Sequence, residues 1–288
     1  MKNYILLIRP HQYIKNLFIF LPLFFSLKMT DFNLLLKTMM AFIAFSLVAS
    51  SVYIFNDYHD IEEDRKHPTK KNRPLASGKV SKQFAKILMI ILLIFGLAIS
   101  YLLKSTVFYL ILSYFILNLL YTLKLKHIVI IDTFIIATGF VIRIFVGSQT
   151  GNIWLSMWII IMTFLLALFI ALAKRRDDVL IYLETGDKTR KIIDGYNLEF
   201  LNTSMVIMAS VVIVSYIMYT ISSDVVSRMH SENLYLTVVF VILGLLRYMH
   251  ITIVEKKSGS PTEMLLRDRF LQLSILGWIA TFILLIYV

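Results

Sequence analysis

Long apolar runs recur along the entire chain, and they restrict its fold more than any other feature. Several runs reach about 20 residues, which is the length that an α-helix needs to cross a bilayer. The chain has 288 residues, 58% hydrophobic and 16% charged, so it is too apolar for an ordinary soluble domain. Strands of a membrane barrel would instead alternate over about ten residues. We therefore predict an all-α integral membrane protein with nine spans, at 16–31, 34–55, 84–103, 105–123, 128–148, 153–173, 203–222, 234–254 and 270–288.

The basic residues gather on one side of this predicted bundle. With the N-terminus placed inside, 24 of the 29 Lys and Arg residues fall on the inner side and 4 on the outer side, while Arg143 lies within a span. This is the positive-inside pattern, so we expect a multi-pass protein of the cytoplasmic (inner) membrane with its N-terminus in the cytoplasm. The net charge of +11 is then a signal of topology, and we expect no nucleic-acid partner.

The organisation of the chain is simple. No linker or low-complexity tract divides it, so we expect a single membrane domain over 1–288. The apolar stretch 4–8 is too short for a signal peptide and is expected to lie at the interface. Four cytoplasmic loops are expected to form a polar cap, at about 56–83, 123–128, 174–202 and 255–268. The absence of cysteine excludes disulfides and thiolate metal sites. The sequence is also compatible with a homo-oligomer.

A cluster of carboxylates follows the second span directly. Asn56, Asp57, Asp60 and Asp64 form the pattern N-D-x-x-D-x-x-x-D. If the helix continues past the membrane surface, the three Asp residues share one helical face. Three neighbouring carboxylates repel one another unless a cation neutralises them, and Mg²⁺ (or Mn²⁺) commonly joins carboxylates to substrate phosphates. The alternative is a solvated helix end with ordinary surface charge.

Basic residues follow the carboxylates in the segment HPTKKNRPLASG, 67–78. Its two prolines interrupt a helix and its Ser-Gly pair favours a turn, so we expect an ordered loop that returns cations towards the acids. Arg73 is the first candidate for phosphate contact, because a guanidinium can bind phosphate with two hydrogen bonds, and Lys71 is the second. Carboxylates for a metal and cations for oxygens together indicate a pyrophosphate site.

These two motifs resemble those of the UbiA superfamily of intramembrane prenyltransferases. The resemblance extends to Tyr121 and Lys126 after the fourth span and to a charged cluster after the sixth. It implies nine transmembrane helices around a central cavity, with the polar motifs at its cytoplasmic mouth and both of these residues near the substrate.

Within the superfamily, the chain is most similar to the decaprenyl-phosphate phosphoribosyltransferase branch. That similarity implies Mg²⁺-dependent transfer of 5-phosphoribose from phosphoribosyl diphosphate to a polyprenyl phosphate, for synthesis of arabinan-type envelope glycans. Two alternatives stay open: prenylation of an aromatic acceptor by a polyprenyl diphosphate, and a transporter, whose charges should line a path at the membrane midplane. The similar stretches are RPHQYIKNLFIF (9–20), LKHIVIIDTFIIATGFVIRIFVG (125–147), ALAKRRDD (171–178), GYNLEFL (195–201) and LLRDRFLQ (265–272).

The charged cluster after the sixth span favours the phosphoribosyl reaction. Its acids do not repeat the spacing of the first motif, and three cations, Lys174, Arg175 and Arg176, precede them. Three cations at a membrane surface can be an anchor, or can hold a further phosphate. Phosphoribosyl diphosphate carries such a phosphate on its ribose, and the lipid acceptor carries another.

Further candidates lie in and after the fifth span. Asp132 and Arg143 are eleven residues apart, or three turns on one face, and charges within a span usually face the interior of a bundle. Their separation of about 16 Å argues against a direct ion pair. On the resemblance, Tyr196 and Glu199 are expected to contact ribose hydroxyls, and Asp268 is expected to belong to a local charge cluster.

Overall fold

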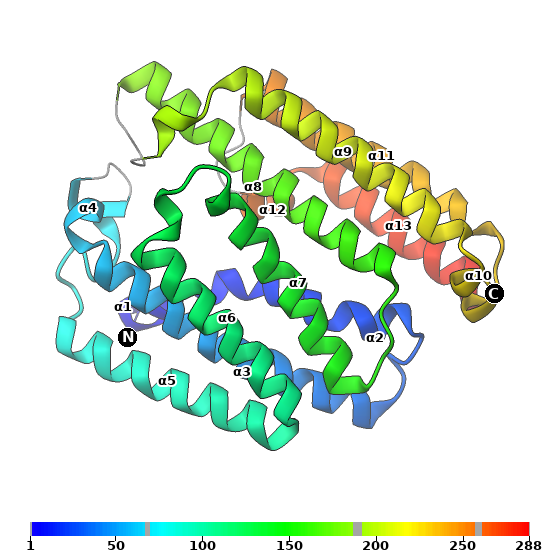
Figure 1. Cartoon of the computed structure of the whole chain (residues 1–288), viewed down its shortest axis with the longest axis horizontal. Coiled ribbons are helices and arrows are strands. Elements are labelled where there is room, and N and C mark those ends of the chain that lie inside the picture. Colours follow the sequence, from blue (N-terminus) through cyan, green and yellow to red (C-terminus); the bar gives the residue numbers. More distant parts are fainter. Residues whose placement is uncertain (1, 67–69, 187–191, 257–260, 288) are drawn as a thin grey trace. The chain divides into compact units, whose positions relative to one another are not determined.

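A computed structural model describes residues 2–66, 70–186, 192–256 and 261–287. Within these ranges every regular element is a helix, as Figure 1 shows. Eight helices are long and apolar enough to cross a membrane, so a multi-pass, all-helical fold is confirmed. Seven are α3 (Phe32–His59), α5 (Lys82–Leu103), α6 (Ser105–Leu123), α7 (Ile131–Gly151), α8 (Met157–Thr185), α9 (Leu198–Ile221) and α13 (Arg269–Tyr287). The eighth is the run Asn233–Val254, which joins η5 (Asn233–Thr237), α11 (Val238–Met249) and η6 (His250–Val254).

The first expected span, 16–31, has a different local structure. After α1 (Lys2–Ile8), the chain forms the 3₁₀ helix η1 (Pro10–Phe20) and then the short helix α2 (Leu21–Phe25). Proline stands at the start of both elements, where its missing N–H is tolerated. The count of nine spans therefore stays a prediction, while the other eight expected spans each correspond to a helix. Their bounds agree within about five residues, except that α8 continues twelve residues beyond the expected end at 173.

The chain divides into two compact units, Met1–Leu155 and Ser156–Val288. In the first unit, α3 is the central helix and packs against α5, α6, α7 and η1. Small residues allow close approach: a Cβ on Gly96 of α5 would lie 2.6 Å from Val48 Cγ2 and 2.8 Å from the carbonyl oxygen of Ala44 on α3. Phe45 of α3 is fully buried beside Tyr114 of α6, with ring centroids 4.5 Å apart.

The second unit is built on α8, which packs against α9, while α11 packs against α13. Tyr216 of α9 links these layers, because its hydroxyl lies 2.7 Å from Thr237 Oγ1 and accepts a bond from Trp278 Nε1 at 2.5 Å. The short helices are α10 (Ser223–Met229) and α12 (Pro261–Arg267). The expectation of a single domain stays a prediction.

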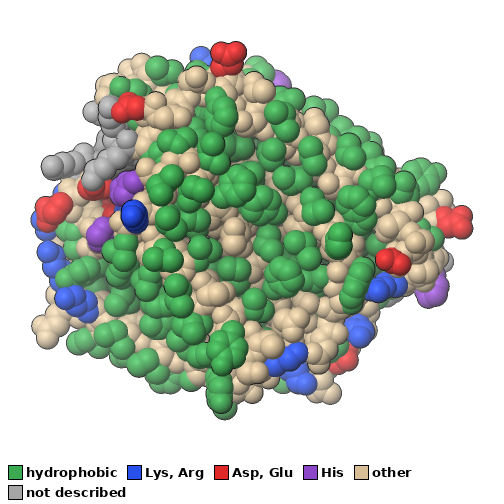
Figure 2. Space-filling model, viewed as in Figure 1, with side chains coloured by type: hydrophobic (Ala, Val, Ile, Leu, Met, Phe, Trp, Pro, Cys, Tyr) green, Lys and Arg blue, Asp and Glu red, His purple; other side chains and the backbone are tan. Residues whose placement is uncertain are grey.

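The surface in Figure 2 and the helix break at Lys104 both agree with the predicted membrane helices. Figure 2 shows hydrophobic side chains over most of the displayed face, with charged side chains near the ends of the helices. The division between the third and fourth expected spans at Lys104 is confirmed: its backbone is extended between α5 and α6. Its amine donates to Asn152 Oδ1 at 2.6 Å at the end of α7.

Candidate active site

The end of α3 presents the carboxylate motif in two short pieces. The helix ends at His59, Asp60 is its C-cap, and α4 (Ile61–Lys66) follows at once. Asp57 and Asp64 are 2% and 4% exposed, whereas Asp60 is only half-buried. The expected continuous helical face is therefore broken at Asp60.

Arg73 joins the two buried carboxylates. Its Nη1 donates to Asp57 Oδ1 at 3.0 Å and to Asp64 Oδ2 at 2.7 Å. The loop carries Arg73 there after the 3₁₀ turn η2 (Lys70–Asn72), and Leu75 and Ala76 beyond it are buried. The expectation that this loop returns a cation to the acids thus agrees with the contacts of Arg73. Lys71 is exposed, and residues 67–69 lie outside the described residues.

Two further residues complete these contacts, and sequence reasoning gave neither of them a role. Arg9, whose backbone is left-handed at φ 52°, donates from Nη2 to Asp57 Oδ1 and lies over the Tyr53 ring. Thr122 of α6 donates to Asn56 Oδ1 at 3.3 Å. Arg9 and Asp57 are 48 residues apart, so no local pattern could have paired them. The only signal was that Arg9 begins one of the stretches that resemble the family.

Asp60 faces a different cation. Lys126, in the 3₁₀ turn η3 (Leu125–His127), is buried and donates to Asp60 Oδ1 at 2.5 Å. Ile130, shortly after it, has φ 71°, a strained conformation for a β-branched residue. The loop after α6 therefore brings Lys126 against the carboxylate motif, and contact of Lys126 with a substrate stays a prediction.

Burial sets the electrostatics of this cluster. It raises the pKa of the Asp64 carboxyl, although Arg73 acts in the opposite direction by charge and by hydrogen bonding, and Asp57 raises it further. An added positive charge near Asp64 would therefore stabilise the ionised form of its carboxyl.

The residues fit Mg²⁺ as a shared partner of Asp57 and Asp64. One guanidinium nitrogen already lies within hydrogen-bonding distance of both carboxylates, so a positive charge is accommodated between them. Mg²⁺ commonly takes one or two carboxylates plus substrate phosphates. Within the described ranges, no three acidic or His side chains are grouped so that they could hold a metal ion, and Asp60 faces Lys126. Asp60 as a third ligand stays a prediction.

The two charges expected inside the fifth span are both buried in α7. Asp132 is fully buried in the first turn. Arg143 donates to Asn16 Oδ1 at 2.8 Å, to the Gly139 carbonyl oxygen at 2.7 Å and to the Tyr114 hydroxyl at 3.4 Å. Its guanidinium also lies near three aromatic rings, those of Phe45, Tyr114 and Phe140. Tyr121 is half-buried in the last turn of α6.

In the second unit, the three cations of α8 have three different surroundings. Lys174 is exposed. Arg175 is fully buried and donates to Asp178 Oδ2 at 2.7 Å. Arg176 donates to Asn202 Oδ1 at 2.7 Å and to the carbonyl oxygen of Thr252 at 2.6 Å, so it joins α8 to α9 and η6. The structure thus gives Arg176 a packing role that the sequence did not indicate, and phosphate binding by the cluster stays a prediction.

The expected ribose contacts lie at the start of α9. Tyr196 is buried, with its ring 6.2 Å from that of Phe200, and Glu199 is exposed in the first turn. Asn197 is the N-cap of the helix, since its Oδ1 accepts from the Phe200 backbone N–H at 2.7 Å. Asp187, one of the acids in the charged cluster after the sixth expected span, lies outside the described residues.

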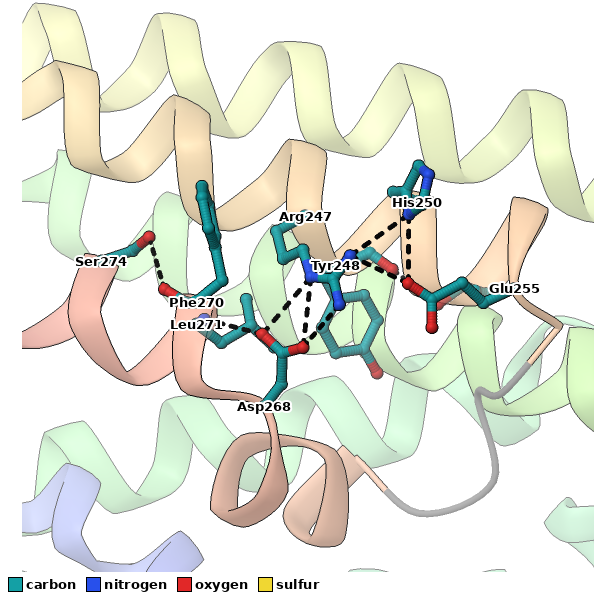
Figure 3. Close-up of polar contacts among 9 residues, drawn as sticks. Arg247, Tyr248, His250, Glu255, Asp268, Phe270, Leu271 and Ser274 are labelled. Carbon is teal, nitrogen blue, oxygen red and sulfur yellow. Dashed lines mark hydrogen bonds and ion pairs between the residues drawn. The ribbon is translucent and has the colours of Figure 1, made fainter.

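The charge cluster at Asp268 is centred on Arg247 rather than on its neighbours in sequence. Figure 3 shows the Arg247 guanidinium between Asp268 and Glu255, with Nη2–Oδ2 at 2.7 Å and Nη1–Oε1 at 2.9 Å. Asp268 Oδ1 also accepts from the Leu271 N–H at 2.8 Å, capping α13. These bonds fix the start of α13 to α11, so we assign the cluster a structural role.

The geometry defines a multi-pass helical membrane protein with a buried cluster of acidic and basic side chains at the end of α3. The chain matches the UbiA prenyltransferase family over residues 17–284. It therefore belongs to that family, and it is a transferase, as the resemblance predicted.

Relatives with assigned names match almost the full chain. The decaprenyl-phosphate phosphoribosyltransferase of Mycolicibacterium smegmatis is 32% identical over 95% of this chain and 89% of its own length. The enzyme of that name from Mycobacterium tuberculosis is 30% identical over 95% and 91%. Among solved structures, a UbiA homologue from Archaeoglobus fulgidus bound to DMAPP and Mg²⁺ has a TM-score of 0.71 at 18% identity, covering 99% of each chain. This last likeness concerns the fold.

Proposed function

We propose that this protein transfers 5-phosphoribose from 5-phosphoribosyl 1-diphosphate to a decaprenyl-like polyprenyl phosphate. The products are pyrophosphate and polyprenyl-phosphoryl-5-phosphoribose, a precursor for arabinan-type glycans of the cell envelope. The observation that carries the proposal is the similarity to decaprenyl-phosphate phosphoribosyltransferases over nearly the whole length of both chains. The cations around the carboxylate motif support it, because the donor and the acceptor are both rich in phosphate.

Asp57 and Asp64, with Asp60 as a third candidate, would hold Mg²⁺ together with the donor diphosphate. When bound, the metal would neutralise negative charge on the departing pyrophosphate. Arg73 stands between two of these carboxylates and would contact diphosphate oxygens, with Lys126 and Asn56 beside it. Lys71, Tyr121, Asp132 and Arg143 are proposed to line the same site.

The acceptor phosphate would attack ribose C1 as pyrophosphate leaves. An oxygen of a phosphate monoester is already ionised near neutral pH, so the reaction needs no strong general base. Displacement in line inverts the anomeric centre and gives a β-phosphoribosyl lipid from an α donor. From the family resemblance alone, we also propose that Arg175 and Lys174 contact a phosphate and that Tyr196 and Glu199 contact ribose hydroxyls.

The remaining finer features are proposed from charge distribution and from the family. The positive-inside bias supports a cytoplasmic N-terminus and site in the inner membrane. Nine transmembrane helices around a central cavity, a polar cytoplasmic cap and self-association are likewise proposals.

Two parallel assays, each with one substrate pair, test the function. Purified protein with Mg²⁺ receives either labelled phosphoribosyl diphosphate with polyprenyl phosphate, or a polyprenyl diphosphate with a labelled aromatic acid. We expect label in the lipid extract from the first pair alone. Prenylation of the aromatic acid without phosphoribosyl transfer would establish the alternative reaction instead.

A further inference from the structure

The 3₁₀ helix η1 carries a lysine that the reaction described above does not use. A 3₁₀ helix has three residues per turn, so three stripes run along it. The innermost stripe is Tyr13, Asn16 and Ile19, the exposed stripe is His11, Ile14 and Leu17, and the half-buried stripe is Gln12, Lys15 and Phe18. Lys15 thus lies between the packed side of η1 and its exposed side, just before the expected span 16–31.

Hydrogen bonds fix η1, and therefore Lys15, in place. The Tyr13 hydroxyl lies 2.8 Å from Ser50 Oγ, and Asn16 Nδ2 donates to Ser46 Oγ at 2.9 Å, both on α3. Asn16 Oδ1 accepts from Arg143 Nε at 2.8 Å on α7. One turn after Lys15, the Phe18 ring meets the Phe140 ring of α7 with centroids 5.0 Å apart.

Lys15 lies within electrostatic reach of two other cations, Arg143 and Arg9, and little negative charge compensates the three. Burial, and then the charges of Arg143 and Arg9, together lower the pKa of the Lys15 amine to about 8. Within the described part of the chain, the Lys15 amine has no hydrogen bond or ion pair, and the partners of Arg143 are all neutral groups. Arg9 pairs with Asp57, which it shares with Arg73.

A positive excess of this kind is unfavourable in a poorly solvated region unless an anion joins it. The aromatic rings around Arg143 stabilise its charge but supply no counter-ion. Since no described carboxylate serves Lys15, the missing negative charge is expected from a ligand.

We propose that Lys15, supported by Arg143 and Arg9, binds the phosphate monoester of the lipid acceptor. This inference rests on the proposed transfer reaction. A phosphate monoester is also present on the donor ribose, but the surroundings of Lys15 favour the lipid. Ile14 and Leu17, on the neighbouring stripe, are 37% and 51% exposed and offer an apolar surface beside the amine for an isoprenoid chain. Lys15 takes no part in bond making and acts by binding and orienting the attacking phosphate.

Two substitutions and a matched control test this site. Lys15→Gln removes the charge, Lys15→Arg keeps it, and Lys37→Gln removes an exposed lysine of α3 about 30 Å along the helix from Asp57. Binding of a polyprenyl phosphate is measured by titration in detergent without donor or metal, with the corresponding polyprenol as the probe that lacks phosphate. We expect the Lys15→Gln variant to bind the lipid phosphate at least about tenfold more weakly, with Lys15→Arg and Lys37→Gln close to wild type.

Stability and kinetics separate ligand binding from a structural role. Without lipid, the Lys15→Gln variant should be at least as thermostable as wild type, because it removes a repelling cation, and it should lose the stabilisation that the lipid phosphate gives. Its KM for the acceptor should rise about tenfold with the donor KM unchanged. A variant less stable without lipid, or a rise confined to the donor KM, would overturn the proposal.

The binding assay also distinguishes this site from the proposed function. Wild-type protein that prefers polyprenyl phosphate to polyprenol, yet forms no phosphoribosyl lipid, would refute the reaction and support the phosphate site. Active wild-type protein whose Lys15→Gln variant binds the lipid phosphate equally well would refute the site and leave the reaction. Equal binding of polyprenyl phosphate and polyprenol by wild type would also refute the site.

Discussion

A single methyl group added at Gly147 should displace η1 and slow the enzyme strongly. Gly147 of α7 lies directly against the backbone of η1. A Cβ at this position would be 1.9 Å from the carbonyl oxygen of Ile19, 2.9 Å from its carbonyl carbon and 3.2 Å from Pro22 Cδ. A carbon normally approaches such an oxygen no closer than about 3.3 Å. Because the obstacle is backbone, η1 must move by more than about 1 Å.

The size of the effect follows from this displacement. Forcing extra volume into a packed interface usually costs about 1–3 kcal/mol. The shift would move Asn16 from Arg143, displace Lys15 beside it and draw Arg9 away from Asp57. Misplacing reacting groups by 1 Å can lower a rate about 100-fold. For Gly147→Ala we therefore expect a lower melting temperature and a loss in kcat/KM of that order.

The assay compares two Gly→Ala variants that differ only in surroundings. Thermal unfolding in detergent and the phosphoribosyl transfer rate are measured for Gly147→Ala and for Gly244→Ala. A Cβ on Gly244 of α11 would meet nothing within 4 Å, so that variant should match wild type or gain up to about 1 kcal/mol from helix propensity. Wild-type stability and rate in Gly147→Ala would refute the close packing of η1 on α7.

Three further substitutions test the charge clusters. Arg73→Gln removes the shared partner of Asp57 and Asp64, so the metal-free protein should lose about 1–3 kcal/mol in chemical denaturation, and Mg²⁺ should stabilise this variant more than wild type. Burial raises the pKa of Asp64 in the folded state, so ionising this carboxyl destabilises the fold as pH rises above the pKa of the unfolded chain. In thermal melts without metal, wild type should therefore lose stability relative to Asp64→Asn between pH 4 and pH 7. The Asp64→Asn variant should be inactive. The hydrogen bond from Arg247 lowers the pKa of Asp268 in the folded state. The ionised Asp268 therefore stabilises the fold above the pKa of the unfolded chain, and this stability is lost as pH falls through the folded pKa. Asp268→Asn should remove this acid sensitivity from the unfolding curve.

The spans that could be predicted from sequence are those whose length and apolarity alone require a helix. The break at Lys104 could also be predicted, because a charge interrupts two apolar runs there. The 3₁₀ geometry of η1 could not be, since its apolar run looks like any other. Its path depends on contacts with α3 and α7, including the approach to Gly147, which lie over a hundred residues away in some cases.

In the candidate site, too, some contacts could be predicted from local spacing and others could not. Local spacing placed Asp57 and Asp64 together and indicated Arg73 as their cation, because all three lie within eighteen residues. The turn of Asp60 towards Lys126 depends on a break of one residue in the helix, which a periodic pattern does not reveal.

Local sequence patterns could not predict the site residues that come from distant segments of the chain. Arg9 reaches Asp57 through its left-handed backbone, and Thr122 reaches Asn56 from another helix. Arg176 looked like a phosphate ligand from its neighbours in sequence, and its hydrogen bonds to Asn202 and Thr252 became apparent only in the fold.

The central claim is that the diphosphate arrives on the sugar and not on the lipid, and position-specific labelling tests it most directly. Phosphoribosyl diphosphate is prepared with ¹⁴C in the ribose and ³²P either in the 5-phosphate or in the β-phosphate, and is incubated with protein, Mg²⁺ and polyprenyl phosphate. We predict that ribose and 5-phosphate enter the lipid extract in equal amounts, while the β-phosphate stays in water as pyrophosphate. Lipid-borne β-phosphate, or no label in the lipid at all, would contradict the account.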